Sequence, residues 1–457
     1  MDASAAPSTA KQDNNELLLK QITGLLENGS LNKVRRFIHD LHPAETAHLI
    51  ESLQPEDRKK IWAVIPPNVM GEILVGLHVE VASGLIEITD RKDLIKAAES
   101  LESDDLVDLL HVIPEPLRSK VMDSISVRKI NRLEFALSYG DDTAGGLMSL
   151  DVLTVRADES LDEVLRYLRK RGSMPTATDN LIVVDRQKHF QGVLSLTVLL
   201  TKDPSSMVSE SMDSSIHGIP YHMPAGEVAL LFEQRDMLSA PVIAEDGRLL
   251  GRITIDDIVD VIRDQADHSF MSMAGLNEEQ DMFSPVVTSA KRRAIWLGVN
   301  LLTAFLASWV IGLFEATLDQ IVALAILMPI VASMGGIAGS QTLTLVIRGL
   351  ALRQISNSNA EQLFRKELAV GAVNGMLWAV VVAVIAGFWF QSASIGALLG
   401  CAMVINLVCA AFAGASIPLS LQKIGIDPAL AGGVLLTTVT DVVGFMAFLG
   451  LATIFLM

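Results

Sequence analysis

Asp441 is the residue whose type and position in this sequence point most directly to chemistry. It is the only charged residue in the run 429–457, which is otherwise apolar. That run is long enough to cross a bilayer, since ~20 apolar residues suffice, and a carboxylate near the middle of such a helix costs roughly 2.5–3.5 kcal/mol. Hydroxyl groups precede it, from Thr437, Thr438 and Thr440. A carboxylate retained at this cost, with hydroxyls beside it, indicates a cation path through a membrane.

Four aspartates further up the chain share one helical face. Asp257, Asp260, Asp264 and Asp267 are spaced by three, four and three residues, and Arg263 is the only basic residue among them. This spacing puts them on one side of a helix, where like charges repel by about 0.2–0.5 kcal/mol per pair. Two interpretations remain open. The face is either a solvated acidic surface or a sensor in which Mg²⁺ neutralises carboxylates from facing elements, because hard oxygen ligands suit Mg²⁺ or Ca²⁺.

Charge is distributed unevenly along the chain. The 457 residues carry 36 basic and 53 acidic side chains, a formal net charge of −17. From Lys291 onward there are 8 basic and 6 acidic residues, so 28 basic and 47 acidic residues precede it. The acidic first part argues against nucleic-acid binding, which needs clustered basic charge. We therefore expect a cationic partner and no nucleic acid.

The second part is expected to cross a membrane, because it holds five long, nearly uncharged stretches in succession. They are 294–314, 321–347, 368–390, 395–421 and 429–457. Basic residues precede the first stretch, separate the second from the third, and separate the fourth from the fifth. By the positive-inside rule the N-terminal part is cytoplasmic and the C-terminus is outside. We expect no signal peptide at the polar N-terminus.

Few other polar side chains lie inside these stretches. We expect Asn300, Asn374 and Asn406 to form hydrogen bonds between helices, with a contact to the ion path as the alternative. Cys401 and Cys409 fall inside the fourth stretch, which implies no disulfide framework. The stretches contain no acid besides Asp441 that could serve a coupling ion, which favours a channel over a coupled carrier.

Residues 16–139 read as short amphipathic helices with a weak internal repeat. Apolar and arginine positions in 47–61 correspond to those in 107–121, about 60 residues on. The pattern predicts a helical array whose neighbours bury one another. A bundle without true repeats is the alternative.

A clearer repeat follows it. The segment 181–185 (LIVVD) and then 192–197 (GVLSLT) matches 241–244 (PVIA) and then 251–256 (GRITID). Such β-branched runs alternate with helical patterns, which predicts strand, helix, strand, strand, helix in each unit.

This second repeat, over 140–263, resembles a tandem pair of CBS domains. Such pairs are regulatory modules that often bind adenosine nucleotides, with a Ser or Thr followed three residues later by an Asp at the ribose. Thr254 and Asp257 fit this pattern in the second unit, whereas Ser195 is followed by Val198 in the first. The resemblance implies ATP binding in the second unit; the alternative is a structural threonine and a helix-capping aspartate.

Three membrane segments carry a wider resemblance. They are 329–341 (PIVASMGGIAGSQ), 425–428 (GIDP) and 438–444 (TVTDVVG). With the helical part and the CBS pair, they resemble the MgtE magnesium transporters over nearly the whole chain. The implied fold is an α-helical membrane protein with five transmembrane helices, plus a cytoplasmic helical N domain and α/β tandem CBS domains. One departure is Ile337, where the family commonly has Asn.

The resemblance implies a domain order and a function. The domains are a disordered N-terminus (1–15), the N domain (16–139), the CBS pair (140–263), a connecting plug helix (264–290) and the transmembrane domain (291–457). The implied function is uptake of Mg²⁺, with cobalt and other divalent cations as further substrates, through a homodimeric, lipid-embedded channel of the bacterial inner membrane that is not an enzyme and is gated by cytosolic Mg²⁺. A Na⁺- or H⁺-coupled carrier and a non-transporting, membrane-anchored CBS sensor are the alternatives, and Asp441 argues against the sensor.

The resemblance also implies roles for individual residues. Pore metal ligands are Asp441, Thr437 and Thr438. Pore-lining or helix-packing residues are Pro329, Gly335, Gly336, Gly339, Gln341 and Gly444. The resemblance carries Asp257, Asp260 and Asp427 onto positions of regulatory Mg²⁺, and we add Asp246, Asp264 and Asp267 as further candidate ligands.

Overall fold

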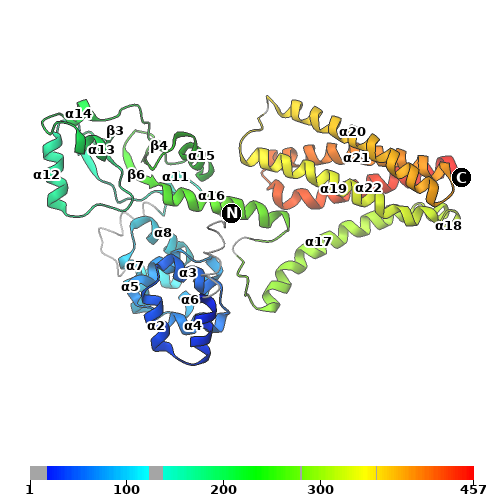
Figure 1. The fold of residues 1–457 in the computed structure, drawn as a ribbon. Helices are drawn as coiled ribbons and strands as arrows, with labels where there is room; N and C mark the ends of the chain where they lie inside the picture. Colours follow the sequence, from blue (N-terminus) through cyan, green and yellow to red (C-terminus); the bar gives the residue numbers. More distant parts are fainter. Residues whose placement is uncertain (1–17, 123–136, 278–279, 357) are drawn as a thin grey trace, which may run out of the picture. The chain divides into compact units, whose positions relative to one another are not determined.

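The structure is a computed structural model that describes residues 18–122, 137–277, 280–356 and 358–457 (Figure 1). The chain divides into two compact units. The first contains the residues up to 266 together with 279–284, and the second contains 267–278 together with 285–457.

Short helices make up the beginning of the first unit. They are α2 (Leu31–His39), α3 (Pro43–Glu51), α4 (Pro55–Trp62), α5 (Pro67–Val75), α6 (Val79–Ile88), α7 (Arg91–Ser100), α8 (Ser103–Val112) and α9 (Glu115–Met122). Prolines begin α3, α4 and α5. The first helical position suits proline, because its missing N–H group would lack a helical partner there anyway.

The repeat predicted in this helical part is confirmed by its packing. The pair α3 and α4 corresponds to α8 and α9, and the inward aliphatic side chains of both pairs are buried. Arg58 Nη2 donates to the Glu51 carbonyl at 3.0 Å, and Arg118 Nη2 donates to the His111 carbonyl at 3.4 Å. Since Glu51 and His111 are separated by the same interval as the two arginines, each arginine ties its helix to the equivalent preceding helix.

Two α/β units follow. The first has β1 (Thr154–Arg156), α12 (Leu161–Arg171), β2 (Asn180–Val184), β3 (Phe190–Ser195) and α13 (Leu196–Thr201). The second has β4 (Ile219–Pro220), α15 (Ala225–Arg235), β5 (Ser239–Ile243), β6 (Leu249–Thr254) and α16 (Ile255–Met273). The short helix α11 (Ala144–Leu147) precedes the first of these units, and the short helix α14 (Val208–Ser211) precedes the second. The predicted order of strand, helix, strand, strand, helix is confirmed in both.

The two sheets repeat one another in topology and register. In each, the first strand pairs parallel with the second, and the second pairs antiparallel with the third. Asn180 lies opposite Ser195 in one sheet, and Ser239 lies opposite Thr254 in the other. The second sheet shares a hydrophobic core with the helical part, whereas the first has a core of its own. The base of α16 is therefore held against the helical part by shared packing.

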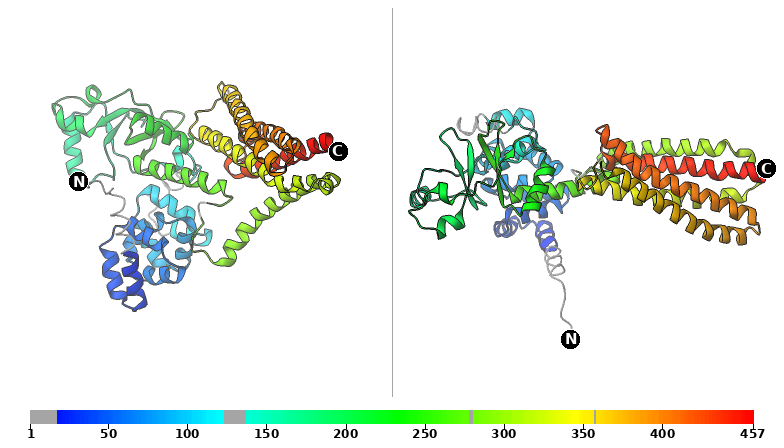
Figure 2. Two further views of the ribbon diagram at one scale, coloured as in Figure 1. Left: turned by 45° about the vertical axis from the view of Figure 1, so that its right-hand side comes forward. Right: turned by 90° about the horizontal axis from the view of Figure 1, so that it is seen from above.

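The second compact unit of the chain (267–278 and 285–457) contains, among the described residues, five helices that are long and apolar enough to cross a membrane. They are α17 (Val286–Gly312), α19 (Ala323–Ala351), α20 (Ala360–Trp389), α21 (Ala393–Lys423) and α22 (Pro428–Leu456), with the short α18 (Glu315–Gln320) after α17. Helices α19 to α22 pack side by side, whereas α17 meets them near α18 and diverges toward its N-terminal end (Figure 1 and Figure 2). Each overlaps a predicted stretch. Helix α17 begins before residue 294 because Lys291, Arg292 and Arg293 are good helix formers.

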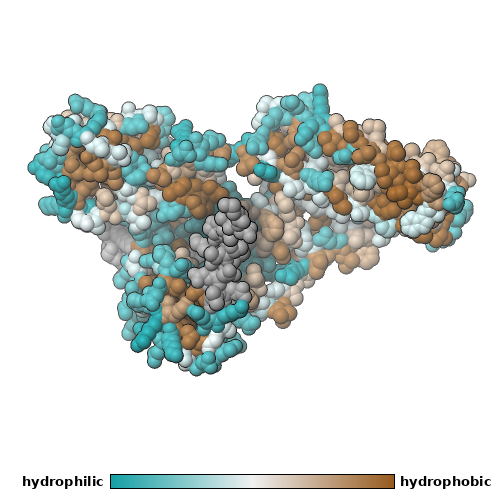
Figure 3. Space-filling model, in the orientation of Figure 1, coloured by the Kyte–Doolittle hydropathy of each residue, from teal (hydrophilic) through white to brown (hydrophobic). Residues whose placement is uncertain are grey.

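Small residues bring these helices close together. A Cβ atom on Gly396 would lie 2.3 Å from the Ala383 carbonyl oxygen, and one on Gly371 would lie 2.6 Å from the Ala411 Cβ. Glycine therefore permits the approach of α20 and α21. On the outside, apolar residues remain exposed over this unit (brown in Figure 3). In α17 only Ala307 and Val310 are buried, so most of its apolar surface is free to face lipid or another chain.

Candidate functional site

Asp441 lies near the middle of α22, and its side chain is only partly covered by the rest of the unit. Within the described residues it has no hydrogen-bond or ion-pair partner. The hydroxyls one turn before it donate within their own helix, Thr437 Oγ1 to Gly433 O at 2.9 Å and Thr438 Oγ1 to Val434 O at 2.7 Å. Their hydrogens are thus engaged, while their oxygen lone pairs stay available to a cation or its water.

The turn that follows Asp441 packs against Asn406 of α21. Asn406 is fully buried, and its Nδ2 donates to Val331 O of α19 at 2.8 Å. A Cβ atom on Gly335 would lie 2.3 Å from this Nδ2, and one on Gly444 would lie 2.8 Å from it. Asn406 is thus the interhelical hydrogen bonder that the sequence predicts. Gly335 and Gly444 are the residues that admit its amide between α19 and α22.

The other residues singled out on α19 have different surroundings. Pro329 lies inside the helix, and Gly339 packs on α22, where an added Cβ would meet Leu436 Cδ1 at 2.8 Å. Gly336 faces open space, and Ile337 and Gln341 are exposed. Packing alone explains Gly339, whereas Gly336 is free to face a partner.

One prediction on a membrane asparagine is wrong. Asn300 does not join two helices, because its Nδ2 donates to Trp296 O of its own helix α17 at 2.9 Å. Asn374 instead lines a pocket that is described below.

Carboxylates of the helical part face the acidic stripe of α16. Asp104, Asp105 and Asp108 lie on α8. The charge of Asp104 acts on Asp257, and that of Asp260 acts on Asp108, so the two sets lie within electrostatic range of one another. Sequence reasoning missed the α8 residues, because acidic residues in the first turn of a helix are ordinarily explained by the helix dipole.

This crowding disfavours the charged forms of the carboxylates. Burial, with the neighbouring Asp104 charge as the next cause, raises the pKa of Asp257 to about 7. Burial likewise raises the pKa of Asp105 to about 6, with the Asp104 charge as the next cause. Burial also raises the pKa of Asp104, whose Oδ1 is buried without a hydrogen-bond partner in the described part of the chain. A cation bound here would relieve the repulsion, and this oxygen would serve as one of its ligands.

The outer aspartates of the α16 stripe are solvated. Asp260 lies 3.2 Å from Arg263, whose Nε lies 3.4 Å from Asp264. Asp264 and Asp267 are exposed. Asp246 lies away from α16, in the turn between β5 and β6, where its Oδ2 is 2.6 Å from Arg248 Nε. The structure therefore offers a local ion-pair role for Asp246.

Asp427 has two roles at the start of α22. One oxygen accepts from Ala429 N at 2.9 Å and caps the helix. The other lies 3.3 Å from Nε2 of His268, which belongs to the last turns of α16. Asp427 thus contacts the part of α16 that lies in the second unit.

The segment 281–284, just before α17, is bound tightly to the helical part. Asp281 forms a bidentate ion pair with Arg58, whose Nη2 lies 2.7 Å from Asp281 Oδ1, and both side chains are over nine-tenths buried. Glu80 accepts from Asp281 N at 2.9 Å and from Ser284 Oγ at 2.7 Å. The Arg58 guanidinium also lies 5.8 Å from the centre of the Phe283 ring. We call the segment 281–284, bound in this way to Arg58 and Glu80, the latch.

The two residues predicted to bind nucleotide, Thr254 and Asp257, form hydrogen bonds with each other. Asp257 Oδ2 accepts from Thr254 N at 3.2 Å and from Thr254 Oγ1 at 3.0 Å. In the first α/β unit (β1 to α13), Ser195 Oγ accepts from Thr197 N at 3.2 Å. Both pairs therefore cap the helices that follow them, which is the structural alternative named above.

None of these acidic groups is a finished metal cage. In the described ranges, no three or more His, Cys, Asp or Glu side chains are placed to hold one metal ion as they stand. The arrangement suits weak sites that tighten when carboxylates from two elements approach one ion.

Comparison with known families decides between the readings of this architecture. The family model of the divalent cation transporter MgtE matches residues 328–451, that of the MgtE intracellular N domain matches 41–142, and CBS domains match 144–204 and 208–264. The magnesium transporter MgtE of Bacillus subtilis is 26% identical over 441 residues, covering 96% of this chain and 98% of the relative. That of Thermus thermophilus is 29% identical over 446 residues, covering 96% and 99%. This chain belongs to the MgtE family.

A solved structure agrees with the MgtE assignment. It is the cytosolic domain of the Mg²⁺ channel MgtE in complex with ATP, similar with a TM-score of 0.50 and 29% identity, and the match covers 53% of this chain and 99% of that one. The fold predicted from the sequence is confirmed: a helical intracellular N domain, a CBS pair and a five-helix membrane part. The chain is a divalent cation transporter of the MgtE family.

Proposed function

We propose that this MgtE-family chain takes up Mg²⁺ through a membrane pore centred on Asp441, and that cytosolic Mg²⁺ closes the pore. The observation that carries the proposal is the unpaired, half-covered carboxylate in the middle of α22. Mg²⁺ keeps most of its water and is usually bound by one or two carboxylates. A single Asp441 with Thr437 and Thr438 beside it suits such a hydrated ion.

A second copy of the chain completes this pore. One chain covers Asp441 only in part and leaves most apolar side chains of α17 exposed. We propose a homodimer in lipid, with the two Asp441 side chains near a shared axis. The two nearby carboxylates would then share one hydrated divalent ion.

The regulatory site lies where α8 meets α16. Asp104, Asp105 and Asp257 repel one another in the absence of a cation, as their raised pKa values indicate. Mg²⁺ held between α8 and α16 would offset this repulsion and favour the closed arrangement of the N domain and CBS pair. Mg²⁺ shifts the population only through its tighter binding to the closed form, and several weak sites together can supply a coupling of a few kcal/mol.

The outer positions of the stripe have supporting roles in this proposal. Asp260, Asp264 and Asp267 extend the acidic face, and Asp427 offers a carboxylate next to the last turns of α16. Asp246 is the weakest of the six, since Arg248 already neutralises it.

The latch gives the N domain a short connection to the membrane. It ends at Ser284, and α17 begins at Val286. Only Pro285 separates the latch from α17, so a movement of the N domain would reach the first membrane helix directly.

Nucleotide and topology complete the proposal. ATP binds in the second CBS unit, which carries Thr254 and Asp257, whereas the first carries Val198 at the position of the aspartate. The N-terminal domains lie in the cytoplasm of a bacterial cell, and the C-terminus lies outside its inner membrane.

Measuring Mg²⁺ uptake into proteoliposomes, at low and at millimolar Mg²⁺ on the side of the membrane that carries the N domain, tests gating directly. Uptake that is indifferent to Mg²⁺ on that side would contradict it.

A further inference from the structure

A polar pocket lies in the membrane unit, apart from Asp441. It has a volume of about 250 Å³ and lies between α19, α20 and α21. Its polar lining comes from Gln341, Thr342, Lys366, Glu367 and Asn374. Since a water molecule takes about 30 Å³ in the liquid, the pocket has room for several.

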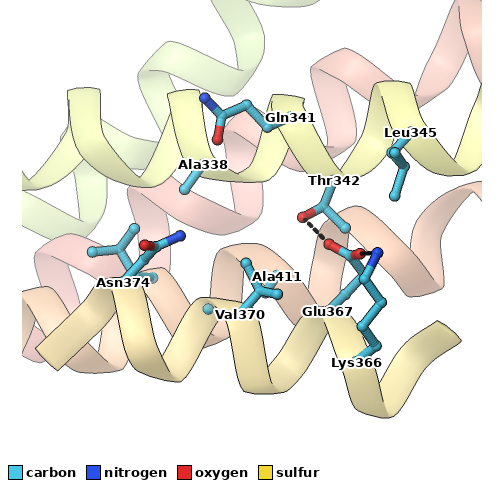
Figure 4. Close-up of a pocket in the computed structure, with 11 residues that line it drawn as sticks. Ala338, Gln341, Thr342, Leu345, Lys366, Glu367, Val370, Asn374 and Ala411 are labelled. Atoms are coloured by element: carbon cyan, nitrogen blue, oxygen red, sulfur yellow. Dashed lines mark hydrogen bonds and ion pairs between the residues drawn. The ribbon is translucent and has the colours of Figure 1, made fainter. Parts of the chain in front are cut away.

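Glu367 is the buried carboxylate of this pocket. The sequence suggested that the third stretch began at Leu368 and held no acid, but α20 begins at Ala360 and places Glu367 inside the packed helices. Its side chain is 7% exposed. Thr342 Oγ1 of α19 donates to Glu367 Oε2 at 3.2 Å, and Lys366 Nζ lies 3.2 Å from Oε1. Figure 4 shows Thr342 and Glu367 pointing toward each other, with Gln341 extending away.

The ammonium of Lys366 is a replaceable neighbour. The Lys366 side chain is 62% exposed, although the carboxylate that it contacts is buried. Because most of the Lys366 side chain is in water, its ammonium remains solvated when it leaves the carboxylate. A buried carboxylate without a counter-charge is far more costly. Glu367 therefore needs a cation, and the mostly exposed Lys366 ammonium is the one beside it in the structure.

The charge of the pocket selects the class of ligand. Lys366 and Glu367 are the only charged residues in its lining. When Lys366 swings into water, one monovalent cation neutralises Glu367, whereas a divalent cation would leave a net positive charge among apolar helices. The other ligands of the cation would be the Thr342 hydroxyl and water molecules. Alkali cations bind such neutral oxygen ligands.

We propose that Glu367 and Thr342 form a binding site for a hydrated monovalent cation, Na⁺ or K⁺, in exchange with the Lys366 ammonium. The site goes beyond the proposed Mg²⁺ path and does not depend on it. Because Thr342 lies on α19, occupancy would link a monovalent cation to the helix that carries Pro329, Gly335 and Gly339.

Thermal unfolding of the purified full-length protein in detergent tests this site. Na⁺ or K⁺ replaces choline at constant ionic strength, and a ligand that binds only the folded state raises the unfolding midpoint. We expect the midpoint to rise with one or both cations in the native chain, and the comparison of Na⁺ with K⁺ identifies the ligand. Glu367→Gln should abolish the rise. The matched control is Glu361→Gln on the same helix, where the exposed Glu361 pairs with Arg365, and it should retain the rise.

Lys366→Gln separates this site from a purely structural ion pair. Without the competing ammonium, the cation concentration that gives half of the rise should fall several-fold. An unchanged or weaker response in Lys366→Gln overturns the proposal, even where Glu367→Gln does not fold. Equal midpoints in Na⁺, K⁺ and choline for the native chain also overturn it. Either result leaves the Asp441 pore untouched, since no Mg²⁺ flux is measured.

Discussion

Arg58 and Asp281 are separated by 223 positions in the chain and form a buried, bidentate ion pair. Arg58 also donates through Nε to Ile50 O at 2.9 Å, so the N domain holds the guanidinium from a second side. The pair fixes the segment that leads into α17 on the N domain, and it gives the gating proposal a specific mechanical link.

Asp281→Asn should therefore release the latch. Removing one partner leaves Arg58 buried without its counter-charge, which costs about 3–5 kcal/mol. We expect 281–284 to become sensitive to protease and Mg²⁺ uptake to become less responsive to cytosolic Mg²⁺. The matched control is Asp57→Asn, which breaks the more exposed pair between Asp57 and Lys60 and should cost at most about 1 kcal/mol. Equal behaviour of the two variants would contradict the latch.

Neutralising the acidic stripe should imitate bound Mg²⁺. With Asp257, Asp260, Asp264 and Asp267 changed to Asn, the repulsion across α8 and α16 disappears. We expect protection of 274–290 from protease without Mg²⁺, at the level that the native chain reaches only in millimolar Mg²⁺. Glu233→Gln, which alters an exposed carboxylate of α15 that belongs to no proposed site, should keep the normal Mg²⁺ dependence. If the native chain is cut equally with and without Mg²⁺, the stripe is a solvated surface.

Protons should act in the same direction as Mg²⁺. The pKa of Asp257 is raised from an ordinary 3.8 to about 7, and that of Asp105 to about 6. Carboxyl groups with raised pKa values favour the packed arrangement fully below pH 4, and this contribution is lost as pH rises through about 6–7. In Mg²⁺-free buffer, protection of 274–290 should thus be stronger at pH 6 than at pH 8. Stronger protection at pH 8 would show that these carboxylates do not oppose closure.

Nucleotide binding should be confined to the second CBS unit. Isothermal titration of the full-length protein with ATP should give one site per chain. Thr254→Ala should remove it, because the hydroxyl and Asp257 form the ribose pair. Ser195→Ala should leave it intact, because Val198 cannot accept from a ribose. Two sites per chain, or normal binding by Thr254→Ala, would refute this asymmetry.

Regular patterns made much of the fold predictable from the sequence. Apolar runs longer than a bilayer requires can hardly be anything but membrane helices, and the β-branched repeats fixed both sheets. Asp441 stood out because a charge inside such a run has a large and local cost. The neighbours Asn406, Gly335 and Gly444 were each noticed, but their meeting at one point depends on how α19, α21 and α22 pack.

Features that depend on contacts between residues far apart in the sequence were missed, because the sequence does not show how the helices pack. Asp104 is separated by some 150 positions from Asp257, and nothing in the local sequence of α8 marks it as a partner. Glu367 stands at the edge of an apolar run, where a solvated acid is the ordinary expectation. Only the packing of α19 and α20 on α21 shows that it is buried.

Mg²⁺ flux through Asp441 variants is the most direct test of the account. Proteoliposomes with a fluorescent Mg²⁺ indicator inside should report uptake by the native chain and by Asp319→Asn, which alters an exposed acid of α18. Asp441→Ala should reduce uptake at least tenfold while folding and dimerisation persist, because an unpaired membrane charge does not stabilise its helix. Near-native uptake by a well-folded Asp441→Ala protein would contradict a pore centred on this carboxylate.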